Sequence, residues 1–199
     1  MLSRIKTNLL LASLTILTLQ PAGAASRAPA HPTLRTVAEQ SNQLTGRYDE
    51  IERLCPAYQQ TWPDKVRCFE FGRTPEGRPM LALAASADGG LDAASAHRAQ
   101  RPIVFMQGGI HAGESDGKDA GMFVLRELLD GAIAPGALSA VTFVFVPVLN
   151  VDGHERFGRW NRPNQVGPEE MGWRTTAQNF NLNRDSSKPM RQRCRRCCG

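Results

Sequence analysis

The feature that most constrains the fold is a strand–helix–strand pattern in the middle of the chain. Residues Ile103–Met106 form a continuous apolar run, and Val141–Val148 is nearly as apolar. Between them, Ser115–Asp130 spaces its apolar side chains like one face of a helix, and Gly131 follows as a C-cap. Two apolar strands joined by a helix indicate an α/β protein whose strands are covered on both faces.

The regions on either side of this unit carry weaker patterns. Leu34–Leu54 has a broken apolar pattern around Gly46, which predicts a helix, a turn and a second helix. Val66–Phe71 and Arg78–Ala84 flank a segment rich in Gly and Pro, which predicts a β-hairpin. No periodicity follows Asn150. A chain of 199 residues fits one domain, because chains of this size bury about 70% of their unfolded surface.

The first 24 residues are typical of a secretory signal peptide. Arg4 and Lys6 precede the apolar stretch Asn8–Leu19, and the small residues 22–24 form a cleavage site. Residues 25–33, rich in Ala and Pro, are then a flexible mature N-terminus. A membrane anchor is the alternative, but the stretch is shorter than the ~20 residues that a bilayer requires. We therefore expect export to the periplasm or the medium without a stable membrane anchor.

The formal charge of +5 does not indicate a nucleic-acid-binding protein. Six of the 24 basic residues lie in the signal or in the last ten residues, which leaves 18 basic against 19 acidic residues in the body. These six are Arg4, Lys6, Arg191, Arg193, Arg195 and Arg196. The body has no basic stripe with interleaved aromatic residues, so we expect no nucleic-acid partner.

Cys55 and Cys68 flank a short segment that contains Pro56 and Pro63, which we interpret as a loop. An exported chain meets an oxidising compartment, so we expect a disulfide between the two cysteines. The alternative is a pair of separately buried thiols.

The pattern His111-Ala112-Gly113-Glu114 lies where the first apolar strand gives way to the helix. An imidazole and a carboxylate three residues apart at such a boundary can hold one zinc ion. The alternative is a hydrogen-bonded histidine at a strand end. A phosphate loop does not fit, because Ala112 stands where that pattern needs glycine and Asp119 where it needs Ser or Thr.

Further motifs follow this one in order: Asn150-Val151-Asp152-Gly153-His154, then Trp173-Arg174, then Asn181-Leu182-Asn183-Arg184-Asp185. The set resembles the zinc carboxypeptidase family (carboxypeptidase A-like) over residues 34–188. The resemblance implies an α/β fold with a mixed, largely buried sheet flanked by helices, and Zn²⁺ held by His111 and Glu114.

The same resemblance assigns roles in hydrolysis of the last peptide bond of peptides or proteins. It implies that Arg174 polarises the carbonyl and that Asn183 and Arg184 bind the C-terminal carboxylate. Arginine suits that task because its planar guanidinium makes two hydrogen bonds to a carboxylate. The alternative is that Arg174 and Arg184 are solvated loop residues.

The sequence departs from the family pattern at several points. Val151 replaces a proline, and His154 stands where tyrosine is common, so we assign His154 no metal role. The resemblance also implies a later histidine ligand, a tyrosine and a general-base glutamate, and none can be placed here. We therefore expect residues 34–188 to be a partial catalytic domain that is inactive as written. A noncatalytic exported module that binds peptide carboxylates through Arg174, Asn183 and Arg184, or metal, is the alternative.

Residues 189–199 differ in composition from the body, because four arginines and three cysteines crowd together there. We interpret this tail as a frameshift product. The alternative is a thiolate metal site formed by Cys194, Cys197 and Cys198.

Overall fold

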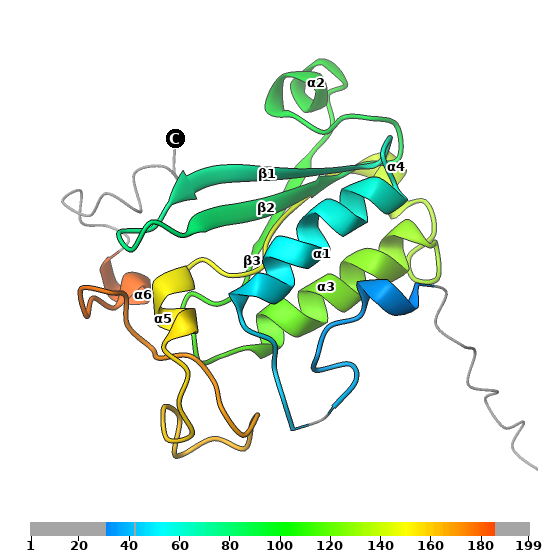
Figure 1. The fold of residues 1–199 in the computed structure, drawn as a ribbon. Helices are drawn as coiled ribbons and strands as arrows, with labels where there is room; N and C mark the ends of the chain where they lie inside the picture. The colour runs from blue at the N-terminus through cyan, green and yellow to red at the C-terminus, as the bar shows by residue number, and fades with distance from the viewer. Residues whose placement is uncertain (1–30, 42, 186–199) are drawn as a thin grey trace, which may run out of the picture. The chain divides into compact units, whose positions relative to one another are not determined.

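The computed structural model describes residues 31–41 and 43–185. The predicted signal peptide, most of residues 25–33 and the arginine-rich tail fall outside them. A four-stranded sheet in the order β1-β2-β4-β3 forms the centre (Figure 1). Its strands are β1 (Val66–Arg73), β2 (Pro79–Ala85), β3 (Ile103–Gln107) and β4 (Thr142–Val146). The helices are η1 (Pro32–Leu34), α1 (Tyr48–Thr61), α2 (Ala93–Arg98), α3 (Asp116–Leu129), α4 (Ala137–Ala140), α5 (Val151–Glu155) and α6 (Leu182–Asp185).

The sheet is mixed, which confirms the predicted fold class. β1 pairs antiparallel with β2, and β2 antiparallel with β4. β3 and β4 run parallel, joined by α3 as the strand–helix–strand pattern predicts. The hairpin prediction is also confirmed, with Gly77 at a positive φ of 84° in its turn.

Helices α1 and α3 lie side by side along one face of the sheet (Figure 1). α1 buries Ile51, Leu54 and Tyr58 against the sheet, and the hydroxyl of Tyr58 donates to the carbonyl of Met122 in α3. Gly121 lets α3 approach β4 closely, because a Cβ there would lie 2.1 Å from the ring of Phe145. These contacts form the hydrophobic core beneath the sheet.

The N-terminal region differs from the prediction of two helices within residues 34–54. Only η1 and the start of α1 are helical there, and α1 continues through Pro56, where the sequence suggested a loop. Proline removes a helical hydrogen bond, but the burial of Leu54 and Cys55 on the core side of α1 outweighs that loss. The structure places Cys55 and Cys68 in a disulfide bond between α1 and β1.

β3 lies at an edge of the sheet, and its side chains are less covered than the sequence predicts. Ile103, Val104 and Phe105 are 50%, 45% and 53% exposed. The prediction that this strand is covered on both faces is therefore wrong for the described residues, whereas Phe143 and Phe145 of β4 are buried. No helix among the described residues is long and apolar enough to span a membrane.

Candidate metal and substrate site

The loop between β3 and α3 carries the metal-binding pattern. Because β3 and β4 are parallel, their carboxyl ends meet at one edge of the sheet, where ligands bind in α/β proteins. Gly108 allows the loop to pass between neighbouring segments, since a Cβ there would lie 2.5 Å from the carbonyl oxygen of Pro147 and 2.9 Å from the backbone of Gly117. Gly109 adopts a positive φ of 58°, which favours glycine. Both glycines therefore help to set the position of His111.

His111 and Glu114 face each other at the end of this loop. The Nδ1 atom of His111 lies 3.3 Å from Oε1 of Glu114. On the opposite side of the ring, Nε2 lies 3.1 Å from Oδ1 of Asn181. When Nε2 carries the proton, it donates to this amide oxygen, and Nδ1 is then available to a metal ion on the side of Glu114. The buried imidazole is thereby oriented like a metal ligand held by an outer hydrogen bond.

The spacing of these two atoms fits a zinc ion. Two ligands that lie about 2.0–2.1 Å from a tetrahedral ion are about 3.3–3.4 Å apart, and the Nδ1–Oε1 separation is 3.3 Å. Within residues 31–41 and 43–185, no group of three His, Cys, Asp or Glu residues is placed to hold a metal. His111 and Glu114 are therefore two facing candidate ligands in the described part of the chain.

Arg174 reaches the same carboxylate, with Nη1 at 3.9 Å from Oε1 of Glu114. The turn at the start of α5 holds its backbone: the Asn150 side-chain amide donates to the Arg174 carbonyl at 3.3 Å. Gly153 accepts from the Trp173 amide at 2.7 Å, and a Cβ on it would lie 2.3 Å from the Thr175 carbonyl. The Asn150–Gly153 turn therefore positions the segment that carries Arg174.

A second arginine, Arg162, contacts Glu114 more closely. Its Nη2 donates to Oε1 of Glu114 at 2.9 Å, and its Nε donates to Gln165 at 3.1 Å. The stem of Arg162 passes over Gly113, where a Cβ would lie 2.9 Å from Cγ. Glycine at position 113 therefore provides the space that this side chain occupies.

Asn183 and Arg184 lie on α6 and are exposed. The Arg184 side chain donates to the carbonyl of Asn183 at 3.2 Å, and its amide donates to the carbonyl of Asn181. The structure thus brings His111, Glu114 and Arg174 together. Among the described residues, these two hydrogen bonds of Arg184 both end on the segment 181–183.

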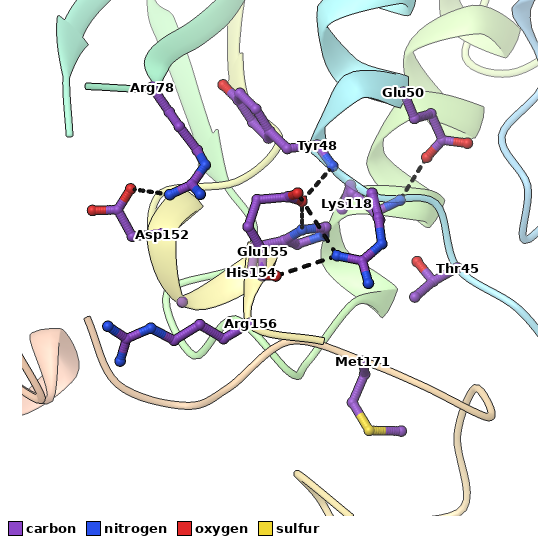
Figure 2. Close-up of polar contacts among 12 residues, drawn as sticks. Thr45, Tyr48, Glu50, Arg78, Lys118, Asp152, His154, Glu155, Arg156 and Met171 are labelled. Atoms are coloured by element: carbon purple, nitrogen blue, oxygen red, sulfur yellow. Dashed lines mark hydrogen bonds and ion pairs between the residues drawn. The ribbon is translucent and has the colours of Figure 1, made fainter. Parts of the chain in front are cut away.

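A buried polar layer lies between α1, α3 and α5 (Figure 2). Lys118 is fully buried and pairs with Glu50 at 2.6 Å and with Asp119 at 2.8 Å. Asp152, also buried, accepts from Arg78 at 2.9 Å and thereby joins α5 to the hairpin turn. These ion pairs hold α1, α3 and α5 in place, and the loops of the candidate site adjoin α3 and α5.

His154 belongs to this layer and not to the metal site. Its Nδ1 lies 3.4 Å from Oε1 of Glu155, and its Nε2 is buried without a hydrogen-bond partner among the described residues. Burial lowers the pKa of His154 below its ordinary value. Although burial acts in the opposite direction on Glu155, hydrogen bonds from His154 and from the Tyr48 amide hold the pKa of its carboxyl below the usual range.

Comparison with known proteins agrees with this geometry. The family model for zinc carboxypeptidases matches residues 51–193. The chain is 30% identical to carboxypeptidase A6 from Mus musculus over 64% of this chain and 30% of that protein. It is also 30% identical to carboxypeptidase B from Astacus astacus, over 54% of this chain and 33% of that protein. The chain therefore spans about a third of the length of these curated relatives.

Among solved structures, a metallo-carboxypeptidase from Burkholderia cenocepacia is 27% identical, with a TM-score of 0.52. The alignment covers 71% of this chain and 33% of that structure. The family match, the shared fold and the His111–Glu114 geometry agree, and the chain belongs to the zinc carboxypeptidase family.

Proposed function

We propose that the chain carries part of the active site of a zinc-dependent carboxypeptidase, in which His111 and Glu114 hold the metal. The observation that carries this proposal is the 3.3 Å separation of their facing atoms, with Asn181 fixing the proton on the far side of the imidazole. When bound, zinc would polarise the scissile carbonyl and lower the pKa of a water molecule.

The remaining roles follow from charge and position. Arg174 lies within 4 Å of the metal-binding carboxylate, so its guanidinium is placed to stabilise negative charge on a carbonyl oxygen. A depression of about 630 Å³ borders Glu114 at the carboxyl end of β3 and offers space for a peptide chain. Asn183 and Arg184 are the proposed partners of the substrate's terminal carboxylate, as the family resemblance implies. The proposed substrates are therefore the C-termini of peptides or proteins.

We expect weak zinc binding and little hydrolysis from the 199-residue chain alone. The described residues provide two metal ligands, and catalytic zinc sites use three protein ligands.

The test is to purify the chain, add zinc and measure the release of C-terminal residues from a set of peptides. We expect release at or near the detection limit, and any release should disappear in Glu114→Gln. Robust turnover would contradict the two-ligand account. Release that survives both Glu114→Gln and Arg174→Gln would contradict the proposed site.

A second candidate function is noncatalytic capture of peptide carboxylates by an exported module. The exposure of Asn183 and Arg184 on α6 favours it, because a planar guanidinium open to solvent can receive a carboxylate. It predicts binding of peptides with a free C-terminus, no binding of the amidated forms, and no cleavage of either. Both functions assign Arg184 to the terminal carboxylate, so Arg184→Gln should lose binding in either case. Binding of the free peptides without any cleavage would support this function over hydrolysis.

We also propose export with removal of residues 1–24. The disulfide between Cys55 and Cys68 supports it, because disulfides persist in oxidising compartments. Mass spectrometry of the exported protein should show a chain that begins at Ala25. An intact Met1 in the exported protein would contradict the proposal.

A further inference from the structure

We propose that Arg162 is a counter-cation of Glu114 that opposes zinc at this carboxylate, so that it weakens metal affinity. The inference rests on the proposed function, since it assumes that Glu114 is a zinc ligand. It makes Arg162 a positioning residue that acts on the metal through Glu114.

Three nitrogen atoms crowd around one oxygen atom of Glu114. Oε1 of Glu114 lies 2.9 Å from Nη2 of Arg162, 3.3 Å from Nδ1 of His111 and 3.9 Å from Nη1 of Arg174. The oxygen that faces the imidazole, and would therefore face the metal, is the oxygen that Arg162 already binds. The arginine and the metal thus use the same atom.

The position of Arg162 is set at both ends of its side chain. Its stem packs over Gly113, its Nε is bonded to Gln165, and the side chain is only 11% exposed. Glu114 itself is 44% exposed, so the carboxylate is reachable while its counter-cation is largely enclosed. A surface ion pair between two solvated side chains would show neither the packed stem nor the second hydrogen bond.

The consequence for metal binding follows from Coulomb's law. A zinc ion about 2.0–2.2 Å from Oε1 would lie at most about 5 Å from Nη2 of Arg162, because that nitrogen is 2.9 Å from Oε1. A dication and a guanidinium at that distance repel each other. Zinc binding must therefore either displace Arg162 or proceed against this repulsion, and both reduce affinity. A residue that merely oriented Glu114 would have the opposite effect, because its removal would weaken zinc binding.

The test measures the zinc dissociation constant of the full chain by competition with a chromophoric chelator. We expect Arg162→Gln to bind zinc about tenfold or more tightly than the wild type, because a unit charge near the metal is removed. Arg162→Lys, which keeps the charge, should stay close to the wild type. The difference between Arg162→Gln and the wild type should shrink at high salt. Equal or weaker binding by Arg162→Gln would overturn the inference.

Arg156→Gln is the matched control for charge. Arg156 belongs to the same segment, but its side chain contacts Glu76, Ala177 and Asn179 and none of the site residues. Its removal should leave zinc affinity unchanged. If Arg162→Gln does not fold, Gln165→Ala tests the same point by loosening the hold on Arg162. It should bind zinc more tightly than the wild type by a smaller factor, and equal or weaker binding would overturn the inference.

Glu114→Gln separates failure of this inference from failure of the proposed function. If zinc binding survives Glu114→Gln, or if no variant binds zinc, the metal site itself is wrong and the inference falls with it. If Glu114→Gln abolishes binding and Arg162→Gln does not strengthen it, only the inference fails. A second readout is thermal: Arg162→Gln should lower the Tm of the metal-free protein but gain a larger Tm increase from zinc than the wild type.

Discussion

At the scale of single residues, the hydrogen bond between Asn181 and His111 decides which imidazole nitrogen is free. Oδ1 of Asn181 lies 3.1 Å from Nε2, so Nδ1 is the proposed metal-binding atom. The Asn181 amide is uncharged, so it can orient the ring without adding negative charge next to the proposed metal position. The site is therefore sensitive to a residue that would not touch the ion.

We predict that Asn181→Ala lowers zinc affinity by about 10- to 100-fold, which is the usual cost of losing such an outer hydrogen bond. Asn181→Asp should retain or increase the affinity, because a carboxylate also accepts from Nε2. Zinc competition titrations of the three proteins decide the point. Wild-type affinity in Asn181→Ala would show that the ring is oriented by other contacts.

His154 should make stability depend on pH. Its pKa is lowered by burial, so the unfolded chain takes up a proton near pH 6.5 that the folded chain does not. The contribution of neutral His154 to stability is therefore fully present above about pH 6.5. It is lost as the pH falls towards the folded-state pKa. Between pH 7.5 and 5.5 we expect a loss of about 1 kcal/mol that is absent in His154→Gln.

Urea unfolding at the two pH values measures this effect, and the exposed His97 provides the control. His97→Gln should keep the wild-type pH dependence. An equal loss of stability in His154→Gln and the wild type would contradict the assignment to His154.

The sequence predicts some site residues and misses others for a physical reason. His111 and Glu114 were predictable because they form a short motif at a strand–helix boundary, and Arg174 because it belongs to the series of motifs that resembles the family. Arg162 carries no such signal, since it lies in an aperiodic loop and reaches Glu114 only through the space above Gly113. Asn181 belongs to a motif that the sequence shows, but only the folded chain reveals its contact with the imidazole.

At the scale of secondary-structure elements, the buried ion pairs of Lys118 hold α1 and α3 together. Its ammonium group bonds to Glu50 of α1 and to Asp119 of its own helix, and Thr45 donates to Asp119 at 2.7 Å. A buried ion pair contributes little net stability by itself, but loss of one partner leaves the other charge buried without a counter-ion. α3 begins shortly after Glu114, so this pairing also supports the loop between β3 and α3.

We predict that Lys118→Met destabilises the fold by about 3–5 kcal/mol, because two largely buried carboxylates lose their counter-ion. The exposed Lys65 is the control, and Lys65→Met should change stability by no more than about 0.5 kcal/mol. Urea unfolding at neutral pH measures both. Similar stabilities for the two variants would contradict the structural role of Lys118.

The elements that the sequence predicts correctly are those with strong local periodicity. The apolar runs and the helical spacing between them give β3, α3 and β4 within a few residues. α1 was predicted poorly, because Pro56 argues against a helix that burial of its apolar face nevertheless stabilises. Exposure of β3 could not be predicted either, since an apolar strand shows the same pattern at an edge and in a covered centre.

At the scale of the whole molecule, the apolar strand β3 forms one edge of the described sheet. The disulfide between Cys55 and Cys68 joins the helix layer to β1, at the other edge of the sheet. A cross-link over 13 residues contributes about 3 kcal/mol in the chain-entropy model.

We predict that reduction of this disulfide lowers the free energy of unfolding by about 3 kcal/mol. Urea unfolding with and without a reducing agent measures the change, and the Cys55→Ala, Cys68→Ala double variant should be insensitive to the agent. Identical curves for the oxidised and reduced wild type would contradict a stabilising bond.

The most direct test of the zinc site is nitrogen-15 NMR of the four histidine side chains during a zinc titration. The account predicts that Nδ1 of His111 shifts on metal binding while its Nε2 stays protonated, and that His31, His97 and His154 are unchanged. Zinc binding that leaves His111 unperturbed, whether at another histidine or at the cysteines of the tail, would contradict the assignment of this site.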